Sequence, residues 1–416
     1  MIKKNQLSIR LHGKPVGVLE QDSVGKKKFH YNEDTKIPIS LGMPIREENY
    51  DDEQCEAFFG GLLPESETAR RIIGKKYGVS PTNSFALLKA IGYDCAGAIS
   101  CHSVDETVKA HASVPLEGIK VSDNELYSHI KSLHTKPLFI DVEGLRLSLA
   151  GVQDKAAVCL IDDYIAFPKD GCPTTHILKP ASLYYPGLAE NEYFCLNIAK
   201  KIGLFVSNVE LRKIKDIIFL LVERYDRRIA NGYIERIHQE DFCQALSIIT
   251  SNKYENEGGP GIKACFDLLM QATQPALDRN KLAAAIVFNY LIGNMDAHGK
   301  NFSLLHHTSS NIRLAPVYDM VSTRVYDNLT SRMAMKIGSK YDADEVLARH
   351  WEQLCEASGY RYISLVTLIK KLCSDIEKAI EVEKIELKEK GFYDPVIDKV
   401  VRVIEANVSK LKKIFT

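Results

Sequence analysis

The stretch LIGNMDAHGKNFSLLHHTSSNIRLAPVYDMVST, residues 291–323, holds the pattern that most restricts what this chain can be. Asp296 and Asn301 lie five positions apart, and Asp319 follows two short apolar runs that predict a hairpin. Such a hairpin would return Asp319 to the neighbourhood of Asn301. An amide and a carboxylate together can ligate Mg²⁺, and a second carboxylate can orient and deprotonate a hydroxyl. The stretch therefore predicts phosphoryl transfer. The predicted strands span 302–307 and 311–318.

Chain length and charge limit the number of subdomains and the classes of partner that this protein can have. A chain of 416 residues exceeds what one hydrophobic core usually serves, so two or three subdomains are expected. The apolar content of 45% is that of an ordinary globular protein. Lys+Arg equals Asp+Glu at 54 each, so no global basic field draws the chain to nucleic acid. Any DNA contact would have to be local or made by a partner.

The ten cysteines are scattered and form no C-x-x-C pair. Most lie in apolar runs, which predicts reduced core thiols rather than disulfides or a zinc site. The N-terminus lacks the apolar run of a signal peptide, and no segment approaches a membrane span. We therefore expect a cytoplasmic protein with no membrane partner.

Local patterns predict a set of elements. A hairpin is expected at 7–20, and polar residues 103–138 are expected to form a linker with one helix around 123–134. The glycine-rich segment Tyr254–Gly261 is expected to be a flexible surface feature, facing substrate or forming a simple turn. Asp241 is expected to cap a helix. Further helices are expected at 52–60, 65–77, 84–91, 190–202, 282–292, 342–357, 362–389 and 395–414, and further strands at 96–102, 145–150, 155–161, 175–178, 206–211 and 216–223.

The loop Gly151-Val152-Gln153-Asp154 lies between two of these predicted strands. Backbone N–H groups in such a turn can cradle phosphate oxygens, and Gly151 lets the chain approach them. The alternative is a plain hairpin turn, and the G-x-G-x-x-G of eukaryotic-type kinases is missing. Ser148 precedes the loop, where a hydroxyl on a strand is the simplest interpretation.

Lys179 ends an apolar strand, where a solvated charge is the common outcome. Placed after a phosphate loop, it can instead pair the α- and β-phosphates of a nucleotide. Glu192 could brace Lys179 or complement the N-terminus of its own helix, and the sequence leaves both open. The buried strand at 216–223 leads into a polar segment that begins with Arg224 and Tyr225, so backbone groups around Glu223–Tyr225 could hydrogen-bond adenine, although any edge of a sheet looks similar.

Several segments, in order, resemble the signatures of HipA-type serine/threonine kinases of bacterial toxin–antitoxin pairs. The resemblance covers most of the chain from about 140 to 325, and F-F-G-G-L-L-P-E at 58–65 resembles the family's N-terminal subdomain. The motifs are G-N-M-D-A-H-G-K-N-F with P-V-Y-D-M-V-S, L-S-L-A-G-V-Q-D-K at 147–155, T-T-H-I-L-K-P at 174–180, E-N-E-Y-F-C at 190–195, V-E-R-Y-D-R-R at 222–228, H-Q-E-D-F-C-Q at 238–244 and K-Y-E-N-E-G-G-P-G at 253–261.

The resemblance implies a role for each residue of the central stretch. Asp296 is the base that positions the acceptor hydroxyl, and Asn301 and Asp319 ligate Mg²⁺. His298 packs under the loop and orients it, and Lys300 neutralises the transferred γ-phosphate. Ser148 matches the family's autophosphorylation site in S-x-A-G-x-Q, where a phosphate would expel the loop from the nucleotide pocket. The implied ATP-binding residues are Ala150, Gly151, Val152, Gln153, Asp154, Lys155, Lys179, Glu223, Arg224, Tyr225, His298, Lys300, Asn301, Tyr318 and Asp319.

The expected fold is α+β, a bilobal protein-kinase-like fold with an additional N-terminal α+β subdomain and a helical C-terminal lobe. The expected boundaries are 1–105 for the N-terminal subdomain, 106–226 for the sheet-containing nucleotide-binding lobe, and 227–416 for the helical lobe with the catalytic loop. ATP and Mg²⁺ are expected in the cleft between the last two.

The resemblance also implies partners. The substrate would be a protein of the translation machinery, such as an aminoacyl-tRNA synthetase, and a helix-turn-helix antitoxin would bring the complex to operator DNA. Two other classes stay open: a small-molecule kinase of aminoglycoside- or choline-kinase type, and a catalytically silent repressor subunit. A hydrolase with Asp296 and His298 as metal ligands is a further alternative, although His306 and His307 lie in a predicted strand with no matching acid.

Overall fold

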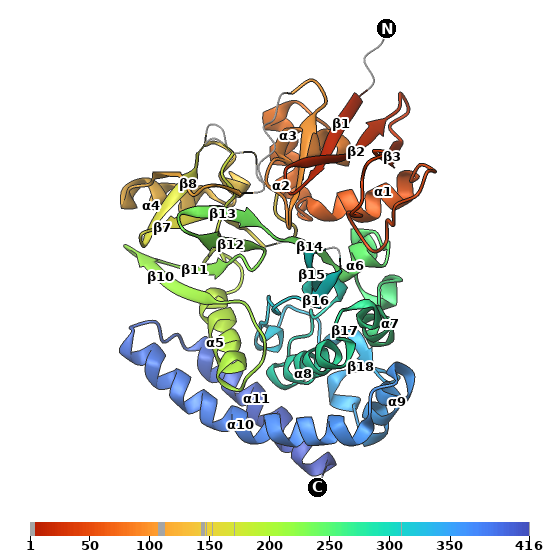
Figure 1. The fold of residues 1–416 in the computed structure, drawn as a ribbon. Coiled ribbons are helices and arrows are strands. Elements are labelled where there is room, and N and C mark those ends of the chain that lie inside the picture. Colours follow the sequence, from red (N-terminus) through yellow and green to blue (C-terminus); the bar gives the residue numbers. More distant parts are fainter. Residues whose placement is uncertain are drawn as a thin grey trace.

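The polypeptide forms a small N-terminal module, a lobe built on a six-stranded sheet, and a mainly helical lobe (Figure 1). The computed structural model describes residues 5–106, 113–142, 146, 148–151, 153–169, 171–308 and 310–415. We call the first of these segments, residues 5–106, the N-terminal module.

The N-terminal module packs three helices on a four-stranded antiparallel sheet of order β3-β2-β1-β4. The predicted hairpin is confirmed, and its turn residues His12 and Gly13 both have positive φ angles, as a tight hairpin turn requires. Helix α2 begins at Glu67 behind the cap residue Ser66, two residues later than predicted. Glu65, which was predicted as the first residue of this helix, lies before it. The elements are β1 Asn5–Leu11, β2 Lys14–Gln21, β3 Lys27–Tyr31, α1 Asp52–Phe59, η1 Gly60–Leu62, α2 Glu67–Tyr77, α3 Ser84–Ile91 and β4 Ile99–Ser103.

The central sheet has the strand order β10-β11-β9-β7-β8-β6. The predicted linker is wrong in part, because β5 and β6 within it pair with β13 and β8. The predicted strand at 145–150 is also wrong, since none of its described residues lies in a strand. The elements are β5 Ser113–Pro115, β6 Gly118–Lys120, α4 Asp123–Ser132, η2 Pro137–Phe139, β7 Ala156–Ile161, β8 Tyr164–Pro168, β9 His176–Pro180, α5 Leu188–Lys201, β10 Val209–Ile214 and β11 Ile217–Glu223.

Strand β11 separates two hydrophobic cores. Successive side chains of a strand point to opposite faces, so Phe219 and Leu221 join the core shared with the N-terminal module. Leu220 and Val222 join the core of the helical lobe. The six-stranded sheet is therefore covered on both faces. The boundaries at 105 and 226 stay predictions, and the shared core shows how closely the module is joined to the sheet.

The helical lobe places α8 beneath a three-stranded sheet of β14, β15 and β16, while α10 and α11 run along the base in Figure 1. Its first residues belong to the lobe expected to be helical, but they form the β12–β13 hairpin. The elements are β12 Arg227–Ala230, β13 Tyr233–Arg236, β14 His238–Asp241, α6 Phe242–Ala245, η3 Thr250–Asn252, η4 Glu255–Glu257, α7 Ile262–Leu268, η5 Leu269–Gln271, α8 Pro275–Ile292, η6 Gly299–Asn301, β15 Ser303–Thr308, β16 Asn311–Leu314, η7 Thr323–Val325, β17 Arg332–Ile337, β18 Lys340–Asp342, η8 Ala343–Glu345, α9 Ala348–Ser358, α10 Tyr362–Glu389 and α11 Val396–Ile414.

All ten cysteines are buried and free, as the sequence predicts. Across the described ranges, no helix combines the length and apolar character that crossing a bilayer would need.

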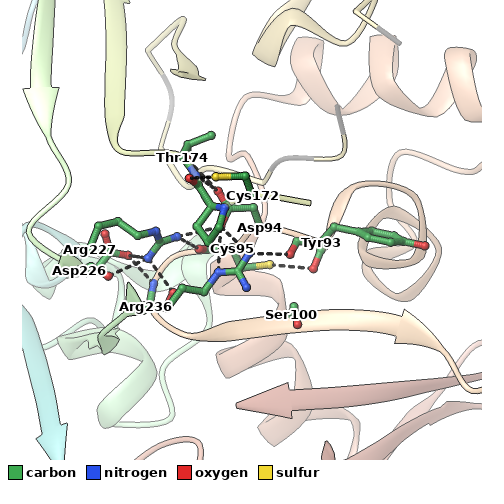
Figure 2. Close-up of polar contacts among 12 residues, drawn as sticks. Tyr93, Asp94, Cys95, Ser100, Cys172, Thr174, Asp226, Arg227 and Arg236 are labelled. Atoms are coloured by element: carbon green, nitrogen blue, oxygen red, sulfur yellow. Dashed lines mark hydrogen bonds and ion pairs between the residues drawn. The ribbon is translucent and has the colours of Figure 1, made fainter. Parts of the chain in front are cut away.

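A buried ion cluster joins the N-terminal module to the sheet (Figure 2). Asp94 of the module accepts from Arg227 Nη2 at 2.8 Å, from Arg224 Nη1 at 3.3 Å and from Arg236 Nη2 at 3.2 Å. The Thr174 hydroxyl donates to the same carboxylate at 2.8 Å. Burial opposes ionisation, but the three guanidinium groups outweigh it and hold the pKa of Asp94 well below its usual range. We call these residues the Asp94 cluster.

Removing the Asp94 carboxylate should destabilise the fold strongly, because the buried guanidinium groups of Arg224 and Arg227 then share the carboxylate of Asp226. The partly buried Arg236 loses its ion pair as well. We expect Asp94→Ala to lower the free energy of unfolding by about 3–5 kcal/mol, as for other broken buried ion pairs. Urea denaturation monitored by the tyrosine and tryptophan signal measures it.

The matched control is Glu210→Gln, which removes a half-exposed carboxylate paired with Arg212 and should cost no more than about 1 kcal/mol. The pKa of Asp94 is depressed on folding, so its contribution is complete above the ordinary value of 3.8 and is lost as the pH falls below it. An equal loss for both variants at neutral pH would contradict this assignment.

Candidate functional site

Three titratable side chains, two from helix or strand elements and one from the segment after β16, meet at the carboxyl end of β9. Lys179 Nζ donates to Glu192 Oε1 of α5 at 2.6 Å and to Asp319 Oδ1. The side chains of Lys179 and Glu192 are 6% and 1% exposed, while that of Asp319 is 36% exposed. Sequence alone left open whether Glu192 braces Lys179 or complements the N-terminus of its own helix. The contact shows that its carboxylate braces Lys179. We call Lys179, Glu192 and Asp319 the ion triad.

The triad is electrostatically coupled. Burial alone would lower the pKa of Lys179, but the carboxylates of Asp319 and Glu192 outweigh it and raise that pKa. Burial would likewise raise the pKa of Asp319, but the ammonium groups of Lys179 and Lys155 hold it below its usual range. At neutral pH, Lys179 is therefore cationic and Asp319 anionic.

The predicted hairpin exists and carries the chain back toward the catalytic loop. Strands β15 and β16 are antiparallel, although β16 ends at Leu314 and an irregular segment leads on to Asp319. The Tyr318 hydroxyl donates to the Lys300 carbonyl at 2.6 Å, which ties this segment to the loop. Asp319 has φ +53°, the left-handed region that few residues other than glycine adopt. Sparsely populated backbone conformations of this kind are concentrated at functional sites.

The catalytic loop, residues 293–302, follows α8 through a left-handed Gly293. The Asp296 N–H donates to Asn294 Oδ1 at 3.1 Å, and Asn294 Nδ2 donates to the Asp319 carbonyl at 3.2 Å. The Asn301 side chain donates from Nδ2 to the Asp296 carbonyl at 3.5 Å. Asn294 therefore holds the Asp296 and Asp319 segments in one site. Sequence reasoning quoted Asn294 within G-N-M-D but gave it no role.

The oxygen donors fit the expected metal ligands. Asp319 Oδ1 accepts a hydrogen bond from Lys179. Among the described residues, no side chain or backbone group donates to Asp319 Oδ2 or to Asn301 Oδ1. Hard oxygen atoms of one carboxylate and one amide suit Mg²⁺.

Lys300 does not lie where its expected role requires. Its ammonium is buried, donates to Asp241 Oδ2 at 2.6 Å and lies 4.0 Å from Glu65 Oε1. Burial opposes the charge, but Asp241 and Glu65 raise the pKa of Lys300. These contacts make Lys300 a support beneath the loop rather than a group facing a phosphate. Asp241 caps α6 as predicted and, in addition, holds Lys300.

The predicted phosphate loop is held by its own lysine. Lys155 Nζ donates to the Ala150 carbonyl at 2.8 Å, and Gly151 has φ +103°, a conformation that favours glycine. Burial lowers the pKa of Lys155 and raises that of Asp154. Gln153 is half-buried beside them, and Val152 lies outside the described residues.

The expectation that residues 223–225 bind adenine needs one correction. The Arg224 N–H donates to the Thr175 carbonyl at 2.9 Å, and its guanidinium belongs to the Asp94 cluster. The N–H and the guanidinium of Arg224 are therefore not available to adenine, and the prediction that Arg224 binds adenine is wrong for these two groups. Tyr225 stacks on Tyr318 with ring centroids 5.8 Å apart, which joins the end of β11 to the Asp319 segment. Glu223 is exposed and accepts from Asn208 Nδ2 at 2.8 Å.

His298 and His306 are held by neighbouring protein side chains. His298 is buried, its ring meets that of Tyr254 edge to face with centroids 5.3 Å apart, and burial lowers its pKa. His306 pairs with Glu240 at 2.8 Å. Within the described part of the chain, no three His, Cys, Asp or Glu residues gather as a metal site would require. The hydrolase alternative therefore finds no support in the geometry.

Sequence reasoning missed three residues that touch this site. Glu65 was assigned to a helix and Tyr254 to a flexible surface feature, while Lys253 was given no role. Instead, Tyr254 donates to Asp296 and Lys253 pairs with Glu65. The one available signal was that both segments belong to motifs quoted above, F-F-G-G-L-L-P-E and K-Y-E-N-E-G-G-P-G.

Comparisons with known proteins agree with this geometry. The HipA-like C-terminal domain matches residues 147–380, and the HipA N-terminal domain matches residues 7–102. The kinase-named protein Y4mE of Sinorhizobium fredii is 43% identical over 85% of this chain and 86% of its own length. The serine/threonine-protein kinase toxin HipA of Shewanella oneidensis is 30% identical over 90% of this chain and 88% of its own. A chain in a solved complex of Shewanella oneidensis HipA, HipB and operator DNA has a similar structure, with TM-score 0.81 and 27% identity. The match covers 98% of the present chain and 96% of the chain in that complex. The bilobal, kinase-like α+β fold expected from the sequence is thereby confirmed.

The ion triad generates a stability prediction. Lys179→Met leaves Glu192, which is 1% exposed, without its ion pair, and should lower the free energy of unfolding by about 3–5 kcal/mol. The double variant Lys179→Met/Glu192→Leu should recover most of that loss, since it removes the uncompensated charge as well. Chemical denaturation of the three proteins tests this, and a double variant less stable than Lys179→Met would contradict it.

Proposed function

The chain belongs to the HipA family of kinases, and from that premise we propose that it is an ATP-dependent serine/threonine protein kinase of the cytoplasm. The observation that carries the proposal is the ion triad, which Asn294 links to the Asp296 segment. A lysine braced by a buried glutamate, an exchangeable aspartate and a nearby carboxylate base form the set that phosphoryl transfer needs.

In this proposal, Lys179 pairs the α- and β-phosphates of ATP, and the loop from Ala150 to Lys155 covers them. Asn301 and Asp319 hold magnesium, which when bound neutralises charge on the phosphates. The Asp319 side chain is 36% exposed, so its carboxylate would be accessible to the metal while Lys179 stays paired with Glu192. Adenine lies near Glu223 and Tyr225, whose ring is fixed by Tyr318.

The transfer step involves Asp296. The acceptor hydroxyl donates its proton to the Asp296 carboxylate while its oxygen bonds to the γ-phosphorus. The bond from the γ-phosphorus to the bridging oxygen breaks, and its electron pair leaves with ADP. The proton then passes from Asp296 to water. His298 and Lys300 take part by holding the loop, since both are buried among its contacts.

The proposed partners follow from the relatives. We propose a helix-turn-helix antitoxin as partner and a component of translation, such as an aminoacyl-tRNA synthetase, as substrate. The solved Shewanella complex contains HipA, HipB and operator DNA. A chain with balanced charge, 54 basic and 54 acidic residues, is consistent with DNA contact made mainly through the antitoxin.

The kinase proposal is tested with labelled ATP and Mg²⁺, with the protein alone and with a dephosphorylated cell lysate. We expect label on one or a few lysate proteins at serine or threonine. Asp296→Asn should reduce transfer by at least about 10²-fold, because the base is lost. The matched control Asp267→Asn, an exposed acid on α7 paired with Lys263, should leave transfer unchanged. Label on a metabolite would indicate a small-molecule kinase, and no label a silent subunit.

Ser148 is the proposed autophosphorylation site. Because Ser148 is buried, its phosphorylation would displace the phosphate loop. The Ser148 side chain is fully buried, and its hydroxyl donates to the Leu62 carbonyl at 2.6 Å. The loop must leave this position to be phosphorylated. A phosphate has no hydrogen to donate to that carbonyl and carries up to two negative charges, so the loop cannot return.

Phosphorylation of Ser148 should therefore open the loop. We expect trypsin to cleave at Lys155 at least about tenfold faster after incubation with ATP and Mg²⁺, because proteolysis follows the population of the open form. Ser148→Ala incubated in the same way should show no acceleration. Equal cleavage of modified and unmodified protein, quantified by mass spectrometry, would contradict the expected release.

A further inference from the structure

The segment Lys253–Gly261, here called the Tyr254 loop, packs tightly against the catalytic loop. A methyl group on Gly299 would lie 2.3 Å from Cγ of Pro260, so the two loops meet at a point where only glycine fits. The Gly259 N–H donates to the Tyr254 carbonyl at 2.8 Å and closes the Tyr254 loop on itself. From the other side, the Lys336 N–H donates to Glu255 Oε2 at 2.7 Å. The prediction of a flexible surface feature is therefore wrong.

The Tyr254 loop holds one oxygen of the catalytic base. The Tyr254 hydroxyl donates to Asp296 Oδ1 at 2.7 Å, and its ring is fixed edge to face by His298. Burial and the Asp296 carboxylate raise the pKa of Tyr254, so the phenol keeps its proton and acts as the donor. With Oδ1 held, Oδ2 is the oxygen left to accept the proton of a substrate hydroxyl.

Glu65 of the N-terminal module anchors the start of the Tyr254 loop. Its Oε2 accepts from Lys253 Nζ at 2.7 Å, and its Oε1 lies 4.0 Å from Lys300 Nζ of the catalytic loop. The side chains of Glu65 and Lys253 are 8% and 11% exposed. Burial opposes ionisation of Glu65, but Lys300 and Lys253 hold its pKa below the usual value. Glu65 is thus an anion between two lysines.

The short segment Leu62–Glu65, which ends at this carboxylate, also contacts the phosphate loop. The Glu65 N–H donates to the Gly151 carbonyl at 3.1 Å, and Pro64 forms a parallel bridge with Gly151. The Leu62 carbonyl accepts from the Ser148 hydroxyl. One short segment of the N-terminal module therefore contacts the phosphate loop through its backbone and the catalytic side through a carboxylate.

We propose that Glu65 is a positioning residue for phosphoryl transfer, acting through Lys253 and Tyr254 to orient the Asp296 carboxylate. The N-terminal module thereby completes the catalytic site, and the placement of the phosphate loop is coupled to the orientation of the base. The inference rests on the proposed kinase function and adds to it a residue outside both lobes.

The test measures kcat and the KM for ATP for transfer to lysate proteins. Glu65→Gln, Lys253→Met and Tyr254→Phe should each lower kcat about 10–100-fold with KM within about twofold, because they displace the base and not the nucleotide. Glu65→Gln/Tyr254→Phe should be no slower than the slower single variant, since both act through one chain of contacts. Lys253→Arg, which keeps the ion pair, should retain most of the rate.

The matched control is Ser40→Ala. It removes another buried contact between the module and the helical lobe, the hydrogen bond to Glu240 Oε2, and neither partner belongs to the contact chain from Glu65 to Asp296. It should leave kcat unchanged. Additive losses in the double variant, or a control as slow as Glu65→Gln, would overturn the proposal. A faster Tyr254→Phe would also overturn it, because the phenol would then be blocking the acceptor position.

A second measurement does not depend on activity. Hydrogen exchange of the full chain should be faster in peptides covering 253–261 and 294–302 for Glu65→Gln than for wild type or Ser40→Ala. Unchanged exchange there would overturn the inference even if no acceptor is labelled. A wild-type protein that transfers no phosphate would instead contradict the proposed function, so the two failures are distinguishable.

Discussion

The site depends on the interaction of one buried ammonium group with two carboxylates that differ in their surroundings. Lys179 lies on a strand covered on both faces, where an unpaired charge would be costly. Glu192 is almost completely buried and lies in direct contact with that ammonium group. Asp319 is partly exposed and can take another partner. The triad therefore combines a fixed ion pair with a replaceable one, and the lysine stays charged in both states.

The positions of these three residues follow from the architecture. Strand β9 lies between β11 and β7, α5 packs against the sheet, and the segment after β16 is tied to the catalytic loop by Tyr318 and Asn294. The N-terminal module is a third contributor rather than an appendage. It shares a core with the sheet and reaches the site through Glu65. Two cores and one ion cluster thus fix the elements on which the reacting groups are placed.

The sequence predicted the parts of this structure that depend on local patterns. The long C-terminal helices, the β15–β16 hairpin and the burial of the cysteines follow from periodicity and turn chemistry. It did not predict contacts between segments far apart in the chain. Lys300 seemed suited to a phosphate until its pairing with Asp241, and Glu65 matched a helix start until its pairing with Lys253. A charged residue has the same letter whether it faces solvent, a ligand or a buried partner, so long-range pairing decided these cases.

The Asp94 cluster bears on how such chains can change over evolutionary time. Its acid comes from the first hundred residues and its arginines from the end of the sheet, more than a hundred positions later. Exchanging the front segment for that of a distant homologue would remove one of the two carboxylates that balance these guanidinium groups and would leave only Asp226, unless the incoming segment brought a carboxylate to the same place. In this chain the two segments are therefore matched to each other, and a recombination that separated them should cost stability.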